Sequence, residues 1–289
     1  MMLFQSVVRN SKIRPNTKIY FENVTNTEYQ IYLDFISLVT RYTELASPRS
    51  VYERSLVCDL AWPQFSSISK EELDLPLAYV ITVFSDPRNI ELSLATIFRP
   101  QNSYCLHIDP KSDHVFRETL ENMMACYRSK YPGSYIFSSS QAVSVRWGQF
   151  SIVQAELNCL KDLLNNGRSW SYALDMAGSE VMLLTNRELV TNLSANIGQI
   201  HTESFPMPKY NLNRIKRKFK LDLKNRLRPF GPHTPPPFNL TIYKGAKAWR
   251  VPRTFVEFLL NHPVAQEFIG IDIFNETFLD NIPFQSGPR

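Results

Sequence analysis

The sequence has no long hydrophobic run and little glycine. Its longest apolar stretch, LAYVITVF, spans only residues 77–84, whereas a membrane-spanning helix needs about 20 apolar residues. The N-terminal stretch MMLFQSVVRNSKIRP also lacks a signal-peptide core. If the protein works in the secretory pathway, we therefore expect membrane anchoring only through a segment absent from this chain. The 289 residues include nine glycines and 19 prolines, which indicates ordered loops rather than flexible linkers.

Several catalytic signatures are also missing. The sequence contains neither a G-x-G-x-x-G nor a G-x-x-x-x-G-K-[ST] phosphate loop, and it has no H-E-x-x-H zinc motif and no G-x-S-x-G nucleophile turn. No D-x-D occurs, so the acidic pair that could hold a divalent ion on a nucleotide diphosphate is absent. We therefore expect no metal site.

The charge is modest for the length of the chain. A formal net charge of +5 permits an anionic ligand but does not by itself indicate nucleic acid. Residues 209–228 form a strongly basic run, KYNLNRIKRKFKLDLKNRLR. This run lacks the aromatic interleaving of a single-strand binding platform, so we predict no nucleic-acid partner. Salt-dependent binding of DNA or RNA through Lys216, Arg217 and Lys218 would overturn that prediction.

The chain has four cysteines, Cys58, Cys105, Cys126 and Cys159. None forms a C-x-x-C pair, and no histidine lies at metal-ligand spacing from them, which argues against zinc. Two interpretations remain, four buried thiols or two disulfides formed in a secretory compartment. N-glycosylation sequons at Asn23, Asn192 and Asn239 favour the disulfides.

The pattern between residues 77 and 193 alternates between strands and helices. The predicted strands are 77–84, 103–109 and 134–138, and the predicted helices are 86–98, with Asp86 as N-cap, and 114–127. Residues 171–193 add a further strand, a small-residue turn at residues 177–179 and a helix. This alternation predicts an α/β fold with parallel strands. Ligands bind such sheets at the carboxyl ends of the strands, where Asp109 and the pair Ser85-Asp86 fall.

A further amphipathic helix is predicted in RWGQFSIVQAELNCLKDLL, residues 146–164. Its apolar stripe passes next to Cys159, which can therefore face the sheet. Trp147 and Gly148 lie in the turn that enters the helix, at the expected ligand edge. A tryptophan there could stack on a flat ring of a ligand or could cap the core, and the pattern leaves both alternatives open.

Six blocks of the sequence, in order and spacing, resemble one enzyme family. The blocks are LAYVITVFSDP, RPQNSYCLHIDPKSD, VRWGQFSIVQAELNCLKDLL, AGSEVMLLTNRELV, IYKGAKAWRVPRTFVEFLL and FNETF. Together they are similar to the core-2/I-branching β-1,6-N-acetylglucosaminyltransferases, which include the proteoglycan xylosyltransferases, and to short nematode-type members in particular. The resemblance covers residues 77–282.

The resemblance implies a GT-A-like, Rossmann-type nucleotide-sugar-binding domain with a mixed, mainly parallel sheet. It also implies a UDP-GlcNAc donor bound without metal, and inverting transfer to the 6-hydroxyl of a mucin-type O-glycan on a glycoprotein. Such enzymes are type II membrane proteins on the lumenal side of the Golgi. We expect an N-terminal stem-like segment at residues 1–75 and a glycosyltransferase domain at residues 76–289 that is shortened at its C-terminus.

The resemblance also assigns binding roles residue by residue. Trp147, Asp109 and Thr82 match positions near the nucleotide of the donor. Lys209 and Glu203 fall in the segment that binds the acceptor.

The cysteines acquire partners through the same resemblance. Cys159 on the amphipathic helix is expected to pair with Cys105, and Cys58 is expected to pair with Cys126. The first bridge would clamp the helix to the sheet, and the second would tie the N-terminal segment to the domain.

The resemblance places Glu276 at the catalytic base. Inverting transfer needs one carboxylate to accept the proton of the attacking hydroxyl. Asn275 is a suitable N-cap, so we expect Glu276 in the first turn of a short helix, where the helix dipole favours the ionised carboxylate.

Departures from the family pattern leave other functions open. Asn275 stands where the family has Asp, and the C-terminal basic segment that neutralises the leaving diphosphate is absent. The alternatives are a truncated, non-catalytic relative that binds a glycan or a nucleotide, and an enzyme that prefers UDP-xylose as its donor.

Overall fold

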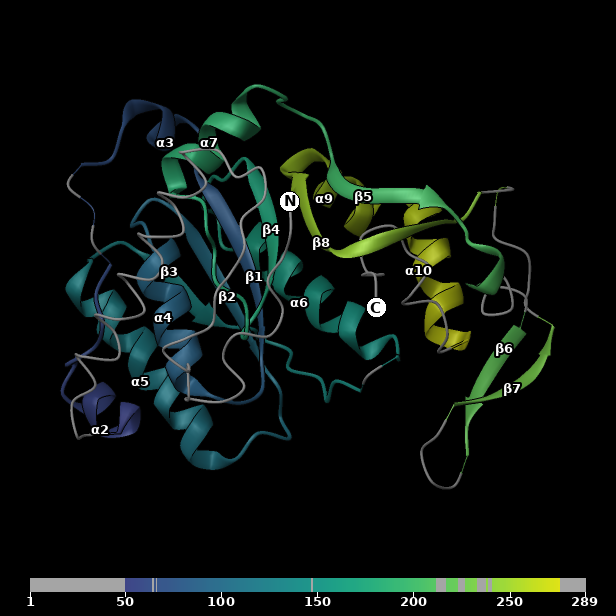
Figure 1. The fold of residues 1–289 in the computed structure, drawn as a ribbon, viewed down its shortest axis with the longest axis horizontal. Helices are drawn as coiled ribbons and strands as arrows, with labels where there is room; N and C mark the ends of the chain where they lie inside the picture. The colour runs from purple at the N-terminus through teal and green to yellow at the C-terminus, as the bar shows by residue number, and fades with distance from the viewer. Residues whose placement is uncertain are drawn as a thin grey trace, which may run out of the picture.

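A computed structural model describes most of the chain, with a mixed α/β domain at its centre (Figure 1). The described residues are 50–275 without 64, 66, 147, 212–216, 223–226, 233–237 and 239–240. The strands are β1 Leu77–Val83, β2 Ser103–Ile108, β3 Tyr135–Ser138, β4 Tyr172–Ala177, β5 His201–Pro206, β6 Arg217–Leu221, β7 Leu227–Pro232 and β8 Tyr243–Pro252. The helices are α2 Val51–Leu56, α3 Lys70–Asp74, α4 Pro87–Ile97, α5 His114–Lys130, α6 Ser151–Asn165, α7 Asn186–Ser194, η1 Lys209–Asn211, α9 Arg253–Asn261 and α10 Pro263–Asn275.

Six strands form one sheet in the order β3-β2-β1-β4-β8-β5. The pairs β1–β2, β2–β3 and β1–β4 are parallel, and β8 runs antiparallel to both β4 and β5. The order β3-β2-β1-β4 is that of the first strands of a Rossmann-type sheet. The predicted α/β class with a mixed, mainly parallel sheet is therefore confirmed.

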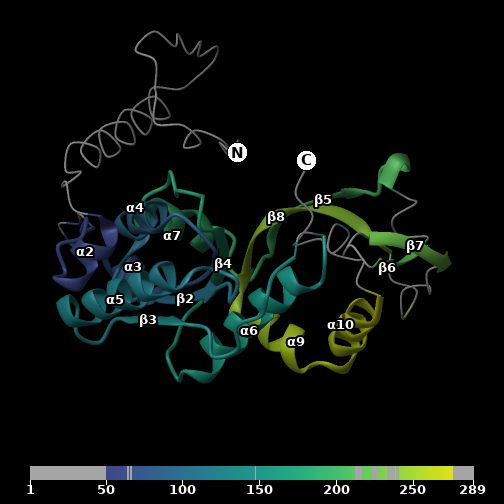
Figure 2. The same ribbon diagram turned by 90° about the horizontal axis from the view of Figure 1, so that it is seen from below.

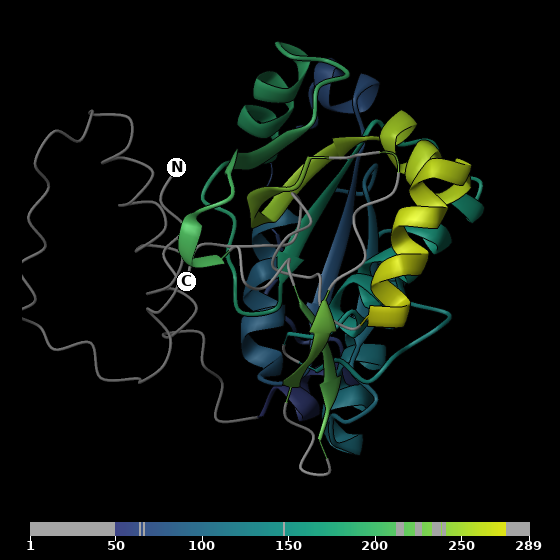
Figure 3. The ribbon, with the colours of Figure 1, turned by 90° about the vertical axis from the view of Figure 1, so that its right-hand side faces the viewer.

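Helices cover both faces of this sheet (Figures 2 and 3). Alternate residues of β1 leave the sheet on opposite sides, and each set belongs to a different core. Leu77, Tyr79 and Ile81 pack with apolar residues of α4, α5 and α7. Ala78 and Val80 pack with α6, α9, α10 and Trp249. Burial on both faces explains why β1 is a continuous apolar run in the sequence.

The described part of the N-terminal segment belongs to the same core. Val51 and Leu60 are buried in the core cluster that contains β1. The guanidinium of Arg54 donates to both carboxylate oxygens of Glu91 on α4, at 2.5 Å each, and the backbone N–H of Ala61 donates to Glu91 Oε1 at 2.7 Å. Glu91 is fully buried, so these contacts fix α2 and Ala61 to the domain. The predicted boundary near residue 75 stays a prediction.

Two helix starts differ from the sequence-based predictions. Asp86 precedes α4 as a suitable N-cap would, but its φ is 58° and its side chain caps no backbone N–H. Asn275 was predicted to begin a helix, whereas it is the last residue of α10. That prediction was wrong because the helix that begins at Pro263 meets no further proline and continues through Gly270 to Asn275.

Candidate active site

The carboxyl ends of β1 and β4 form the point at which the strand order reverses. From β1 the chain continues to β2 on one side, while β4 lies on the other side of β1. Open α/β sheets bind ligands in the crevice at such a point. Thr82, a predicted donor residue, is half-buried here and is the register partner of His107 on β2 and Ala177 on β4.

A glycine keeps the turn after β4 close to β1. The backbone N–H of Gly178 donates to the carbonyl oxygen of Thr82 at 2.9 Å. A Cβ atom at Gly178 would lie 2.5 Å from Ile90 Cδ1 and 2.9 Å from Val83 Cγ1, so a larger residue would clash. The Glu180 carboxylate closes the turn by accepting from Ala177 N–H at 2.8 Å. The small-residue turn predicted from the sequence therefore lies at the expected ligand edge.

Asp109, the second predicted donor residue, follows β2 directly and is buried. Its carboxylate accepts from the backbone N–H of Lys111 at 2.9 Å and from that of Val145 at 3.2 Å. The Lys111 ammonium lies 3.4 Å from Asp109 Oδ2. The structure thus brings Asp109 and Thr82 to the ends of neighbouring strands. Asp109 also holds the loop that leads toward residue 147.

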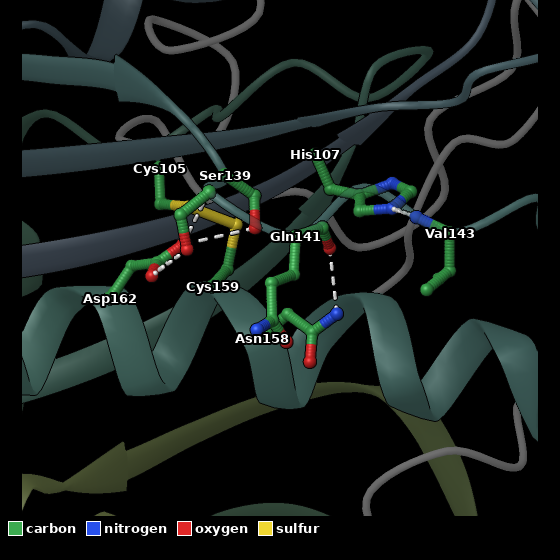
Figure 4. Close-up of a disulfide and its surroundings, with 9 residues drawn as sticks. Cys105, His107, Ser139, Gln141, Val143, Asn158, Cys159 and Asp162 are labelled. Atoms are coloured by element: carbon green, nitrogen blue, oxygen red, sulfur yellow. Dashed lines mark hydrogen bonds between the residues drawn. A yellow bond between two sulfur atoms is a disulfide. The ribbon is translucent and has the colours of Figure 1, made fainter.

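That loop, residues 139–146, is the β3–α6 loop, and polar side chains attach it to β2 and α6 (Figure 4). Val143 N–H donates to His107 Nε2 at 3.0 Å, and Asn158 Nδ2 donates to the carbonyl oxygen of Gln141 at 2.7 Å. Asp162 accepts from the Ser139 hydroxyl at 3.0 Å and from the Ser140 N–H at 2.8 Å. The loop that precedes Trp147 is therefore fixed from both sides.

A disulfide lies under the β3–α6 loop. Cys105 on β2 and Cys159 on α6 are fully buried and bonded to each other, and Figure 4 shows the bond beside Ser139 and Asp162. The second disulfide joins Cys58, after α2, to Cys126 on α5. Both pairs are those that the family resemblance implied. The first clamps the helix to the sheet at the ligand edge, and the second ties the N-terminal segment to α5.

Removing the disulfide at the ligand edge has a measurable cost. The double change Cys105→Ala and Cys159→Ala is expected to lower the free energy of unfolding by about 2–5 kcal/mol, because the bond restricts the unfolded chain. Urea unfolding followed by circular dichroism measures this. Lys161→Ala, at an exposed position of α6, serves as the control, with an expected change below about 0.5 kcal/mol. A double variant as stable as the wild type would show that the bond does not stabilise this edge.

His107 gives the β3–α6 loop a dependence on pH. Burial lowers the pKa of its imidazole, and the Asp109 carboxylate opposes this. Nε2 accepts from Val143 N–H, so the ring is neutral in the folded protein. A lowered folded-state pKa means that the stability is present above the ordinary pKa of about 6.5 and is lost as the pH falls below it.

We expect His107→Gln to remove this acid sensitivity, because the glutamine oxygen can accept from Val143 without titrating. Between pH 7.5 and pH 5.5 the wild type should lose on the order of 1 kcal/mol relative to the variant, the worth of one hydrogen bond. Urea unfolding at both pH values tests this. His114→Gln is the control because His114 is exposed. Equal losses in the wild type and in His107→Gln would contradict the assignment.

The predicted acceptor residues lie on and just after β5, the outermost strand of the sheet. Glu203 is exposed on the edge strand β5, and Lys209 is exposed in η1, three residues after β5 ends. Since β5 is antiparallel to β8, and β8 is antiparallel to β4, β5 runs in the same direction as β1 and β4. Lys209 therefore follows a strand that ends on the same edge as Thr82 and Asp109, which suits a shared donor and acceptor site.

A buried cluster of charges connects β4, α6 and β8. The Lys247 ammonium lies 2.8 Å from Asp175 Oδ2 and 3.8 Å from Glu156 Oε1, and Trp249 Nε1 donates to Glu156 Oε2 at 3.2 Å. Burial raises the pKa of Asp175, while Lys247 opposes the rise. Burial would lower the pKa of Lys247, but Asp175 and Glu156 raise it well above its usual value. Lys247 is therefore charged.

This cluster lies beside the predicted acceptor segment. The register of β5 and β8 passes from Thr202↔Trp249 to Ser204↔Gly245, so β8 has additional residues, Lys247 among them, opposite Glu203. Such bulges re-aim side chains next to functional sites. The ion pairs of Lys247 hold this irregular part of β8 against β4 and α6. Sequence reasoning missed the cluster, because its members are separated by up to about 90 residues along the chain.

Sequence reasoning also did not identify Phe84 as an exposed residue at the expected ligand edge. Phe84 follows β1 at the ligand edge and is 70% exposed, and its carbonyl oxygen accepts from the Ser112 hydroxyl at 2.8 Å. The signal was available, since Phe84 is the last apolar residue of the β1 run. Trp147 and Glu276 lie outside the described residues, so their predicted roles stay predictions.

Neither a metal centre nor a membrane span is found in the part of the chain that the structure describes. Within it, no three His, Cys, Asp or Glu side chains gather closely enough to hold a metal ion. No helix in that part is both long and apolar enough to cross a membrane.

Comparison with known proteins identifies similar sequences. The family model described as "Core-2/I-Branching enzyme" matches residues 77–275. The bovine beta-1,3-galactosyl-O-glycosyl-glycoprotein beta-1,6-N-acetylglucosaminyltransferase 3 is 34% identical over 206 residues, covering 70% of this chain and 44% of that protein. The human protein of the same name is 33% identical over 207 residues, covering 70% of this chain and 45% of that protein. The match thus spans less than half of either relative.

Among solved structures, a 4-diphosphocytidyl-2C-methyl-D-erythritolsynthase from Anaerococcus prevotii aligns with a TM-score of 0.36 and 12% identity. The alignment covers 69% of this chain and 80% of that chain. This structural similarity is too low to support a conclusion about the site.

Proposed function

Because this chain belongs to the Core-2/I-branching enzyme family, we propose that it transfers N-acetylglucosamine from UDP-GlcNAc to the 6-hydroxyl of a mucin-type O-glycan on a glycoprotein. One observation carries the proposal. The residues that the family model matches, 77–275, include the whole six-stranded sheet and the edge at which its predicted donor residues meet. The curated relatives that the chain resembles are named as β-1,6-N-acetylglucosaminyltransferases acting on such glycoproteins.

The donor is proposed to bind at the strand-order reversal beside β1. Thr82 would face the nucleotide from β1, and Asp109 would meet the uridine from the end of β2. The backbone N–H groups of Lys111 and Val145 already orient the Asp109 carboxylate, so it would receive the donor with little rearrangement. Trp147 follows the β3–α6 loop by one residue and is proposed to stack near the nucleotide.

Transfer is proposed to proceed by a single inverting displacement. The 6-hydroxyl of the acceptor attacks the anomeric carbon of GlcNAc as the bond between that carbon and the diphosphate oxygen breaks. Glu276 takes the hydroxyl proton, and UDP leaves with the bonding electron pair. We propose that cationic side chains rather than a metal stabilise the charge on UDP. Lys111, 3.4 Å from Asp109 at the ligand edge, is one candidate.

The proposed compartment is the Golgi lumen. Two disulfides in one domain fit an oxidising compartment. A membrane anchor would have to lie outside the described helices.

The proposal is tested by initial-rate transfer of labelled sugar to Galβ1-3GalNAc in excess EDTA. We expect transfer from UDP-GlcNAc and little from UDP-xylose. Preference for UDP-xylose would favour a xylosyltransferase. Binding of UDP-GlcNAc without transfer, in a sample shown to be folded by circular dichroism, would favour a non-catalytic relative. Transfer that requires added Mn²⁺ would remove the metal-independent part of the proposal.

A further inference from the structure

The positive charge of the chain is concentrated in one segment, residues 209–232. This segment contains nine Lys or Arg residues and one Asp, a net charge of +8. The whole chain carries +5, so the remaining residues together carry −3. The charge of the chain is therefore a property of this segment, and an anionic partner would be drawn to it rather than to the rest of the surface.

Two strands of this segment, β6 and β7, form the β6–β7 hairpin, which is separate from the main sheet. β6 and β7 pair antiparallel as a sheet of their own, and they lie beyond α10 at the end of the molecule opposite α2 (Figures 1 and 2). Arg217, Arg228 and Phe230 are exposed there. The single acidic residue, Asp222, pairs with Arg228 at 3.2 Å.

The edges of the hairpin argue against pairing with another strand. β7 contains Pro229 and Pro232, and proline has no N–H to donate to an added strand. Basic residues are concentrated in β6, which is how sheet edges avoid pairing. Contact with a partner would therefore be made through side chains. Arginine binds carboxylates well, because its guanidinium can donate two parallel hydrogen bonds to one carboxylate.

The position of the hairpin indicates which partner reaches it. The hairpin follows β5 and η1 in the chain, and these elements hold the predicted acceptor residues Glu203 and Lys209. A strand of five or six residues extends for roughly 17–20 Å, a length that suits an extended polypeptide attached to an O-glycan. The exposed rings of Tyr210 and Phe230 add apolar surface for such a chain.

We propose that the β6–β7 hairpin binds an acidic polypeptide stretch of the acceptor glycoprotein, next to the glycan that is extended. The inference rests on the proposed function for the identity of the partner. Binding of the acidic stretch can be measured independently of catalysis.

The test compares two synthetic glycopeptides that carry the same Galβ1-3GalNAc, one flanked by Glu residues and one by Gln residues. We expect the acidic glycopeptide to have a KM about three- to tenfold lower, with equal kcat. Arg217→Gln with Arg228→Gln should remove this difference and leave turnover of the neutral glycopeptide unchanged. Lys70→Gln with Lys161→Gln removes the same charge from exposed sites elsewhere and should preserve the difference.

Fluorescence anisotropy of the labelled acidic peptide without its glycan separates the two proposals. Salt-sensitive binding that the hairpin variant loses supports the inference even if no transfer is detected. Equal binding by the wild type and the hairpin variant overturns the inference. So does stronger competition by single-stranded DNA or by vesicles of anionic lipid than by the acidic peptide. Transfer without any preference for acidic flanks would retain the proposed function and remove this inference.

Discussion

Glu276→Gln is expected to reduce kcat for GlcNAc transfer by about 10²- to 10⁴-fold, the usual contribution of a general base. Glutamine has a similar size but cannot accept the proton of the attacking hydroxyl. The KM for UDP-GlcNAc should change little, because the donor is proposed to bind at the edge that contains Thr82 and Asp109. Initial rates with saturating donor and acceptor measure the effect.

Glu267→Gln is the matched control, since Glu267 is an exposed carboxylate on α10, and its kcat should equal that of the wild type. The assignment of Glu276 now rests on the family resemblance alone. Asn275 belongs to α10, so it does not act as the predicted N-cap. A Glu276→Gln variant with more than about half of the wild-type kcat would remove this residue as the base.

Lys247→Met should destabilise the fold by on the order of 3 kcal/mol at neutral pH, because one partner of a buried ion pair is removed. The change leaves Asp175 and Glu156 with side chains only 1% and 2% exposed. The Lys247 side chain is itself 31% exposed, which places the cost at the lower end for such pairs. Urea unfolding measures the loss, and Lys161→Met, at an exposed site, should cost below about 0.5 kcal/mol.

The loss of unfolding free energy caused by Lys247→Met should depend on pH and on the charge of Asp175. Burial raises the pKa of Asp175 even with Lys247 present, and without Lys247 it should rise further. A raised folded-state pKa lowers stability as the pH rises, so the variant should lose more stability at pH 8 than at pH 5. Adding Asp175→Asn removes the isolated charge and should restore part of the loss. A pH-independent loss, or no recovery with Asp175→Asn, would show that packing and not charge is responsible.

The parts of the fold that depend on short sequence patterns could be predicted. The apolar run from Leu77 to Val83 predicts β1, and the stripe around Cys159 predicts the face of α6 that meets the sheet, because hydrophobic periodicity reflects burial directly. The pairing of the cysteines could not be derived from spacing, because four cysteines allow three connectivities. It followed from the family resemblance.

Contacts between distant segments could not be predicted from the sequence. Arg54 and Glu91 meet only because α2 packs against α5, which brings the Arg54 guanidinium to Glu91 on α4. The segment before residue 76 gave no pattern that indicated this contact. Lys247 resembles a solvent-exposed lysine in the sequence until β8 is placed beside β4. Asn275 is a suitable N-cap in the sequence but belongs to α10, because the preference of one residue is weaker than that of the helix that precedes it.

The central claim is that this chain is a metal-independent, inverting β-1,6-N-acetylglucosaminyltransferase. It is tested most directly by proton and carbon NMR of the trisaccharide made from UDP-GlcNAc and Galβ1-3GalNAc in excess EDTA. The account predicts a β-configured GlcNAc attached to the 6-oxygen of GalNAc. An α-linked product, attachment at another oxygen, or a product that forms only when Mn²⁺ is added would contradict it.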